Sequence, residues 1–509
     1  MRKAFRRWLT HLPFLVLFAY SLHGVGLCCD DFDLLVLVPR DRSFGYLLAN
    51  PANILTHGLP FLWLGYEDQG AYDLLKFGWV AAAYAMAYRF GGLFFAAPRA
   101  ALFAALFVFY PSHDSTSFWF TTQYLLLTAA FYLYAFYLAS RDRLAAAAAM
   151  ATLASFVSYG STPWALGLGL VFLLQRQFRR AAVLLVPNLV YIAYYATMTL
   201  WLGLGNKRLP TEVHAEPLLK QFALQIAGGV DAVLGPSLWL KIGYSVGSLT
   251  LVSAIVGAAI IFVLVQDTRT PAGEARVPRP VWLGAAAVAL ASFAMFALAA
   301  GAYPQLAFGM VNRVTVHASF GAALLLAYLA RRAWSAGALA AVLTFSSLGL
   351  SDHWHAWHGV QDGTIEALRH DAELASGRLG TDILFVTGNP YSRLGPIAHI
   401  DFLSQLHIAD SVFRIALGER KTFSVVPLRP HFVAEPHALV DPRANVRYPI
   451  AANVAVYDAQ AAALRRIDAA EMPSLIAGLE SEKRHWIHSM QPEWLRDALQ
   501  RWMRQFLRR

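Results

Sequence analysis

Cysteine and charge are what this 509-residue sequence has least of. It contains only two cysteines, the neighbours Cys28 and Cys29. Adjacent cysteines rarely pair with each other for geometric reasons, so no disulfide framework is available. Charged residues make up 15% of the chain and hydrophobic residues 57%, whereas about a quarter of the residues in an average soluble domain are charged. The composition excludes an ordinary soluble protein and predicts a polytopic α-helical membrane protein.

The positive net charge does not indicate a nucleic-acid partner. The formal net charge is +10, but the basic residues cluster between apolar runs. Arginine and lysine at such positions orient a membrane protein, because they stay on the cytoplasmic side. We therefore expect the lipid bilayer as a partner and no nucleic acid.

Apolar runs recur along the chain to about residue 350 and are separated by short polar gaps. A helix needs about 20 mainly apolar residues to cross a bilayer. The pattern predicts about eleven spans, the first of them retained rather than cleaved as a signal peptide. The predicted spans lie roughly at 8–28, 72–90, 98–111, 117–139, 144–160, 164–176, 181–203, 243–265, 281–301, 311–330 and 334–350.

The gaps after every second predicted span are rich in arginine. The stretch "RKAFRR" precedes the first span, "SRDR" follows the fourth, "RQFRR" the sixth and "RRAW" the tenth. By the positive-inside rule all of these gaps face the cytoplasm. The N-terminus is then cytoplasmic, and the loops with acidic residues and histidines share the opposite face.

The chain changes character after residue 351. The stretches "TDILFVTG" (381–388) and "VAVYDA" (454–459) predict strands, and later stretches predict amphipathic helices. No later apolar run is long enough to span a membrane. We therefore expect two domains: residues 1–351 form the transmembrane domain, and residues 352–509 form a small α/β domain on the extracytoplasmic side.

Three carboxylates, Asp30, Asp31 and Asp33, follow the first span directly. At mid-bilayer they would cost roughly 8–10 kcal/mol together on the insertion scale, so they must lie at the water boundary. Clustered acids suit a general base or the ligands of a hard cation. The alternative is a solvated helix end. His113 and Asp114 in "YPSHDSTS" fall on the same predicted face, with a purely structural pair as their alternative.

The distribution of charge favours an enzyme over a transporter. Transporters place ionisable groups near the middle of the bilayer. The predicted spans at 117–139, 144–160, 181–203, 243–265, 281–301 and 334–350 contain no Asp, Glu, Lys or Arg. Charge gathers at the ends of the spans instead. A flippase or transporter of lipid-linked glycans remains an alternative, as does a polymerase or ligase that joins such glycans.

One arrangement of motifs resembles a known superfamily. A first span ending in an acidic pair, an amphipathic segment, and a short pair of spans that returns to "YPSHDSTSFW" resemble the GT-C glycosyltransferases. The resemblance covers roughly residues 8–351 and is strongest over 8–140. These enzymes use sugars linked to polyprenyl phosphate. The resemblance therefore implies an inverting sugar transfer on the periplasmic or luminal face.

The resemblance also implies roles for individual residues. The acidic pair of the superfamily falls on Asp30 and Asp31, one of which would be the general base, and its second acid falls on Asp114. His113 beside Asp114 and the extra acid Asp33 are expected to contact substrate.

A transferase also needs cations for the departing phosphate. Arg313 is the first candidate because arginine grips phosphate bidentately, and Lys207 and Arg208 in "GNKRLP" are others. Interfacial anchoring is the alternative for Arg313. The sequence does not decide whether the acids bind a divalent cation. The histidines of "HWHAWH" (353–358) tempt as transition-metal ligands, but interfacial placement is the commoner case.

Together these features predict a glycosyltransferase of the bacterial inner membrane. Its donor would be a polyprenyl-phosphate-linked sugar, and its acceptor an envelope glycan, lipid or protein. The prediction requires Asp30, Asp31, Asp114 and Arg313 to border one cavity.

Overall fold

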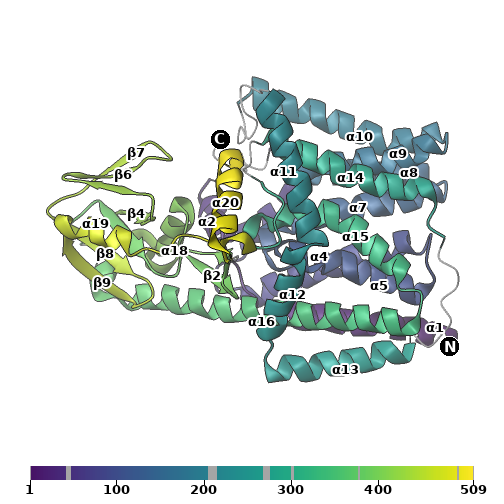
Figure 1. Ribbon diagram of the computed structural model, residues 1–509, viewed down its shortest axis with the longest axis horizontal. Helices are drawn as coiled ribbons and strands as arrows, with labels where there is room; N and C mark the ends of the chain where they lie inside the picture. The colour runs from purple at the N-terminus through teal and green to yellow at the C-terminus, as the bar shows by residue number, and fades with distance from the viewer. Residues whose placement is uncertain are drawn as a thin grey trace.

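The computed structural model describes residues 2–41, 48–203, 215–267, 276–299, 303–376, 379–489 and 492–507. Most helices of one part run roughly side by side and form a bundle, which α11 (Ala215–Val233) and α12 (Pro236–Gly247) cross, and a smaller part with the strands lies at one end of the bundle (Figure 1). The longer helices of the bundle are α1 (Arg2–Leu22), α4 (Gln69–Gly91), α5 (Ala97–Val108), α7 (Gln123–Ser140), α8 (Leu144–Val157), α9 (Thr162–Leu174), α10 (Phe178–Ala196), α11 (Ala215–Val233), α12 (Pro236–Gly247), α13 (Leu251–Asp267), α14 (Arg279–Leu298), α15 (Val316–Leu329) and α16 (Ala333–His370).

The number of predicted spans is wrong. Among the described residues, six helical segments are long and apolar enough to cross a membrane. Several predicted spans form helices that are too short to cross alone: α5 has 12 residues, α8 has 14, α9 has 13 and α13 has 17. The fold is that of a helical membrane protein, but with six candidate spans instead of eleven. These are Phe120–Ser140, Phe178–Thr199, Glu216–Gly247, Arg279–Leu298, Met310–Leu329 and Ala333–His370.

One of the six candidate spans overlaps the predicted spans only at its end. The segment Glu216–Gly247 comprises α11 and α12, where the sequence pattern predicted no span before residue 243. Asp231 and Lys241 interrupt its apolar run. The structure gives both a partner: the Asp231 carboxylate accepts hydrogen bonds from the backbone N–H of Ser237 at 3.2 Å and from its hydroxyl, and Lys241 pairs with Asp114.

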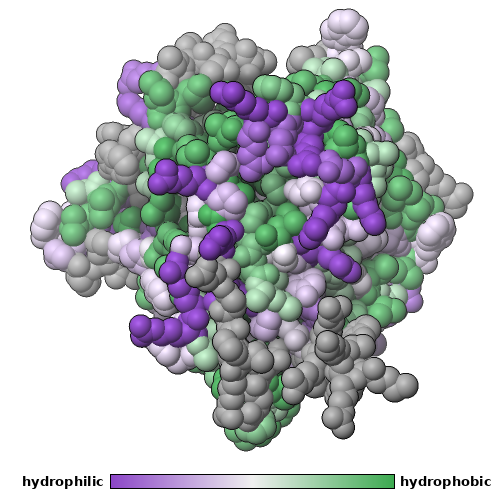
Figure 2. Space-filling model, turned by 90° about the vertical axis from the view of Figure 1, so that its right-hand side faces the viewer, coloured by the Kyte–Doolittle hydropathy of each residue, from purple (hydrophilic) through white to green (hydrophobic). Residues whose placement is uncertain are grey.

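Arginines gather at the end of the bundle that is remote from the strands. The turns α7–α8, α9–α10 and α15–α16 and the start of α14 all lie at this end (Figure 1). Figure 2 shows hydrophilic residues spread across this face. The arrangement agrees with the alternating loops of the sequence pattern, and the cytoplasmic assignment of this face remains a prediction. The exposed arginines of these turns are Arg141, Arg143, Arg176, Arg179, Arg276, Arg279, Arg331 and Arg332.

The predicted α/β character of the C-terminal region is confirmed. A four-stranded sheet has the order β4-β1-β8-β9, in which β1 pairs in parallel with β4 and β8, and β9 is antiparallel to β8. Helix α18 (Leu406–Leu417) crosses over from β1 to β4. The strands are β1 (Ile383–Thr387), β2 (Tyr391–Leu394), β3 (Ile397–Asp401), β4 (Ser424–Pro427), β5 (Val433–Glu435), β6 (Ala438–Asp441), β7 (Val446–Pro449), β8 (Asn453–Asp458) and β9 (Ala463–Asp468), followed by α19 (Met472–Ala477) and α20 (Glu493–Leu507).

Helix α16 connects the bundle to the strands. It has 38 residues, and the predicted boundary between residues 351 and 352 lies within it. Helix α18 packs against α16 and against α2 (Asp30–Asp41), which carries the three clustered acids. Phe32 of α2 contacts Phe402 at 5.7 Å between ring centres, and both belong to one continuous hydrophobic core. The C-terminal region is therefore docked directly on the acidic end of the bundle.

Candidate active site

Asp31 is fixed inside the protein. Its side chain is completely buried, and one carboxylate oxygen accepts hydrogen bonds from the Trp119 indole at 3.2 Å and from the backbone N–H and hydroxyl of Thr121, the former at 3.0 Å. The other oxygen accepts from the backbone N–H of Cys28 at 3.1 Å. Asp31 thereby ties the start of α2 to the segment that contains η4 (Phe120–Thr122). With both oxygens engaged, it positions its neighbours and is not open to substrate.

Protonation of Asp31 should make stability depend on pH. Burial raises the pKa of its carboxyl from the usual 3.8 to about 7. Between pH 4 and pH 7 the folded chain therefore holds a proton that the unfolded chain has lost, so stability falls as pH rises through this window. We expect Asp31→Asn to flatten the dependence of the unfolding temperature on pH between 4 and 7, as measured in detergent. An unchanged slope would contradict this assignment.

Asp30 and Asp33 face the C-terminal region. The carboxylate of Asp30 lies 3.3 Å from Nε2 of His407, and the Asp30 side chain is 43% exposed. Asp33 accepts a hydrogen bond from the hydroxyl of Ser411 at 3.1 Å. The hydrogen bond to Asp30 raises the pKa of His407, and burial raises the pKa of Asp33. Of the three clustered acids, Asp30 and Asp33 thus have partly exposed side chains, and Asp31 is buried.

Arg313 lies beside the same elements in η7 (Met310–Thr315). Its guanidinium carbon stands 4.9 Å from the ring centre of Trp119 and 5.4 Å from that of Tyr303. One terminal nitrogen donates to the carbonyl of Met310 at 3.2 Å, while Nε is buried without a hydrogen-bond partner among the described residues. Trp119 therefore contacts Asp31 through its N–H and Arg313 through its ring.

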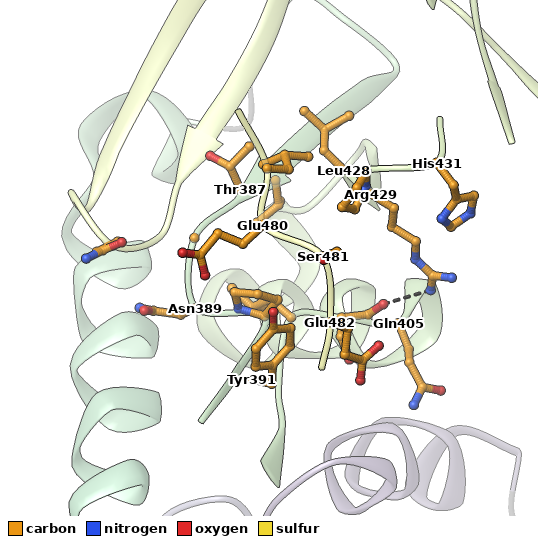
Figure 3. A pocket seen from close by; sticks show the side chains of 18 of the residues that line it. Thr387, Asn389, Tyr391, Gln405, Leu428, Arg429, His431, Glu480, Ser481 and Glu482 are labelled. Atoms are coloured by element: carbon orange, nitrogen blue, oxygen red, sulfur yellow. Dashed lines mark hydrogen bonds between the residues drawn. The ribbon is translucent and has the colours of Figure 1, made fainter. Parts of the chain in front are cut away.

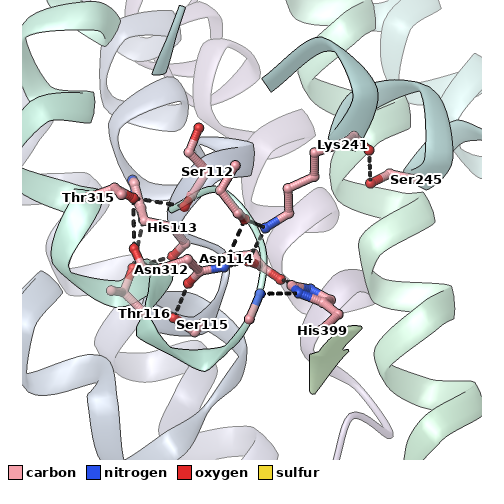
Figure 4. Close-up of polar contacts among 12 residues, drawn as sticks. Ser112, His113, Asp114, Ser115, Thr116, Lys241, Ser245, Asn312, Thr315 and His399 are labelled. Carbon is pink, nitrogen blue, oxygen red and sulfur yellow. Dashed lines mark hydrogen bonds and ion pairs between the residues drawn. The ribbon is translucent and has the colours of Figure 1, made fainter. Parts of the chain in front are cut away.

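Asp114 forms the centre of a different, fully buried network (Figure 4). One oxygen pairs with Lys241 of α12 at 2.6 Å and accepts from the amide of Asn312. The other accepts from His399 of β3 and from the indole of Trp354 of α16, both at 2.9 Å. Burial alone would raise the pKa of Asp114, but Lys241 and His399 hold it well below its usual range. Asp114 joins four elements and has all its hydrogen-bonding capacity satisfied.

His113 is buried beside Asp114. Its Nδ1 lies 2.7 Å from the Thr116 hydroxyl, in the same helical turn. Burial lowers the pKa of His113 to about 4, so the imidazole is neutral at pH 7. Its position indicates that His113 stabilises this turn, in agreement with the alternative of a purely structural His113–Asp114 pair.

The structure brings some of the predicted residues together and separates others. Asp31 and Arg313 both contact Trp119, and Asp30 precedes Asp31 in the chain. Asp114 belongs to a separate network, which approaches this group through Asn312, the neighbour of Arg313, and through Trp354, which stacks on Phe118 beside Trp119. A cavity of about 1110 Å³ lies in the C-terminal region and borders none of the four residues expected to share one. Lys207 and Arg208 lie outside the described residues.

Metal ligation finds little support in the geometry. In the parts of the chain that the structure describes, no three His, Cys, Asp or Glu side chains are grouped to hold a metal ion. The histidines of "HWHAWH" bind separate partners: His353 lies 2.9 Å from the Ser392 hydroxyl, His355 2.7 Å from the Gly24 carbonyl, and His358 3.2 Å from Asp362.

Four partners of the predicted site residues escaped the sequence analysis. Lys241, Trp354 and His399 lie far from Asp114 in the chain, and only Lys241 carried a signal, as a lone lysine in an apolar stretch. His407 follows no recognisable motif.

Comparison with known proteins adds no relative. No family model matches the chain, and neither a curated protein nor a solved structure matches it. The link to the GT-C superfamily therefore rests on the sequence motifs alone, and the function is argued below from the residues.

Proposed function

We propose that this chain is a membrane glycosyltransferase that moves a sugar from a polyprenyl-phosphate donor to a cell-envelope acceptor. The observation that carries the proposal is that a carboxylate and an arginine lie close to one tryptophan. Trp119 donates its indole N–H to Asp31, the neighbour of the 43% exposed Asp30, and the Trp119 ring lies 4.9 Å from the guanidinium carbon of Arg313. Helix α2 packs against α18, and η7 contacts β3, so both groups lie at the end of the bundle that carries the strands. A base and a cation at one membrane surface are the two groups that this transfer needs.

Asp30 would act as the general base. An acceptor hydroxyl attacks the anomeric carbon of the donor, and its proton passes to the Asp30 carboxylate as the new glycosidic bond forms. His407 holds that carboxylate by a contact of 3.3 Å. Asp31, bonded to Trp119 and Thr121, keeps the start of α2 in place.

Arg313 would stabilise the leaving group. As the bond between the anomeric carbon and the phosphate oxygen breaks, the polyprenyl phosphate takes the electron pair and gains negative charge. A guanidinium has five N–H donors, and one terminal nitrogen of Arg313 donates to the Met310 carbonyl, so further donors remain for that oxygen. The aromatic rings of Trp119 and Tyr303 orient the guanidinium, which limits the entropy lost when it binds phosphate.

The orientation in the membrane follows from the same proposal. The arginine-rich face would be cytoplasmic under the positive-inside rule, which places Asp30, Arg313 and the C-terminal region on the periplasmic side of a bacterial inner membrane. A polyprenyl-phosphate donor presented on that surface would meet the site directly.

Reconstitution tests this function. The purified chain in proteoliposomes is supplied with a polyprenyl phosphate carrying a radiolabelled sugar and with cell-envelope fractions, and label in the acceptor is counted. We expect transfer by the wild type and a loss of about 10²–10³-fold in Arg313→Gln. The matched control Arg279→Gln, at the exposed opposite end, should transfer normally.

Two results would contradict the proposal. The first is a wild type that leaves all label on the polyprenyl phosphate, including the case in which the lipid crosses the bilayer unchanged, as a flippase would cause. The second is an Arg313→Gln variant with full activity.

A further inference from the structure

The cavity of about 1110 Å³ in the C-terminal region lies outside the site proposed above. It opens where the parallel strands β1 and β4 end (Figure 3). Asn389 follows β1 and Arg429 follows β4, and both line it. Open sheets with parallel strands bind ligands at the carboxyl ends of those strands. The position and size of the cavity are therefore those of a binding site for a small molecule.

The cavity carries an excess of positive charge. Four arginines line it, and two of them are neutralised: Arg393 pairs with Glu480, and Arg484 pairs with Glu482 and with Asp401, the last at 2.7 Å. No ion pair joins the other two, Arg429 and Arg443, to a carboxylate within the described ranges. Arg429 uses one terminal nitrogen to donate to the Ser404 carbonyl at 2.7 Å. Its remaining N–H groups suit a phosphate or a carboxylate.

Aromatic and amide side chains also line the cavity. Trp357 and Tyr391 line the cavity together with the amide side chains of Asn389, Gln405 and Gln460. The indole N–H of Trp357 is buried without a hydrogen-bond partner among the described residues, although a buried tryptophan N–H usually has one. Aromatic rings combined with planar amides fit the apolar faces and hydroxyls of a sugar. In Figure 3 Arg429, His431 and Gln405 lie on one side of the cavity, and Asn389, Tyr391 and Glu480 on the other.

The cavity lies next to the acidic end of the bundle. Gln405, just before α18, lines the cavity, and His407, two residues later, contacts Asp30. The charge of Arg429 acts on His407. Trp357 contacts Phe402, which contacts Phe32 of α2. The first turn of α18 therefore separates the cavity from Asp30.

We infer that this cavity binds an anionic saccharide, with its negative group at Arg429 and its ring against Trp357 and Tyr391. Binding itself is independent of the proposed function. That the saccharide is the acceptor of the transfer rests on the proposed function. It follows from the position of Gln405, which lines the cavity two residues before His407, the partner of Asp30.

Three sugars that differ only at carbon 6 test the inference: glucose, glucuronic acid and glucose 6-phosphate. Calorimetry on the purified full chain in detergent measures their dissociation constants. We expect at least one charged sugar to bind about tenfold or more tightly than glucose, and the better of the two shows whether a carboxylate or a phosphate is preferred. Equal binding of all three, or no binding, would overturn the inference.

Two arginine variants test which arginine binds the negative group of the sugar. Arg429→Gln should remove the preference for the charged sugar, whereas Arg420→Gln, exposed in the turn after α18 and outside the cavity, should keep it. An equal loss in both variants would overturn the inference. If Arg429→Gln does not fold, Arg429→Lys takes its place, with an intermediate preference expected because lysine cannot bind bidentately.

The closing comparison separates this inference from the proposed function. Asp30→Asn should bind the charged sugar as the wild type does. If the wild type binds the charged sugar but transfers no sugar from the polyprenyl phosphate, the proposed function fails while the binding site stands. If the wild type transfers sugar but binds no charged sugar, the binding site fails while the function stands.

Discussion

Replacing Lys241 by methionine is expected to destabilise the protein by about 3–5 kcal/mol, the range for breaking a buried ion pair on one side. Lys241 and Asp114 are both fully buried and 2.6 Å apart. Without the ammonium group, Asp114 retains its bonds to His399, Trp354 and Asn312 but has no counter-charge. Since those partners come from three separate elements, their packing should loosen together. Thermal unfolding in detergent measures the effect.

The matched control is Lys220→Met on the neighbouring helix α11. Lys220 also pairs with an acid, Glu216, but both side chains are more than half exposed. Exposed pairs contribute about 0–1 kcal/mol, so the unfolding temperature of this variant should stay near that of the wild type. The double variant Lys241→Met, Asp114→Asn should recover part of the loss, because the uncompensated charge is gone. Equal unfolding temperatures for Lys241→Met and Lys220→Met would show that the buried pair is not a structural junction.

The local sequence pattern was sufficient to predict the elements that do not depend on distant residues. The strands β1 and β8 were predicted at 381–388 and 454–459 because short β-branched and aromatic runs end there in turn residues. The alternation of arginine-rich gaps could also be predicted, because the membrane surface, and not tertiary contacts, determines which gaps carry arginine. The count of spans failed for the opposite reason. Helices α5, α8, α9 and α13 are apolar and yet short, and a hydropathy pattern does not show where a helix ends.

Only part of the candidate site could be predicted from the sequence. The cluster of acids was visible, but not the difference between Asp30 and Asp31. Successive residues of a helix point about 100° apart, so Asp31 turns inward to Trp119 and Asp30 outward to α18. Lys241 and His399 stand 127 and 285 residues from Asp114. No local signal connects residues at such separations, which is why Asp114 was predicted as a catalytic acid and its buried network was missed.

Replacing Asp30 by asparagine is expected to lower the rate of sugar transfer by about 10²–10⁴-fold, the usual contribution of a general base. Asparagine keeps the size of the side chain and a hydrogen bond to His407, but it cannot take the proton of the acceptor hydroxyl. The loss should therefore fall on kcat, with KM for the donor within about twofold of the wild type. The labelled-sugar assay with varied donor concentration separates the two constants.

Three further variants distinguish chemistry from structure at this position. Asp142→Asn removes an exposed carboxylate at the opposite end of the bundle and should transfer normally. Asp30→Glu keeps a carboxylate on a longer side chain and should recover part of the rate, which a merely space-filling role of Asp30 does not predict. Asp31→Asn should alter the pH dependence of stability more than kcat, because Asp31 is closed to substrate. If Asp30→Asn kept the full kcat while Asp31→Asn lost it, the base would be Asp31, and its hydrogen bonds to Trp119 and Thr121 would have to open during turnover.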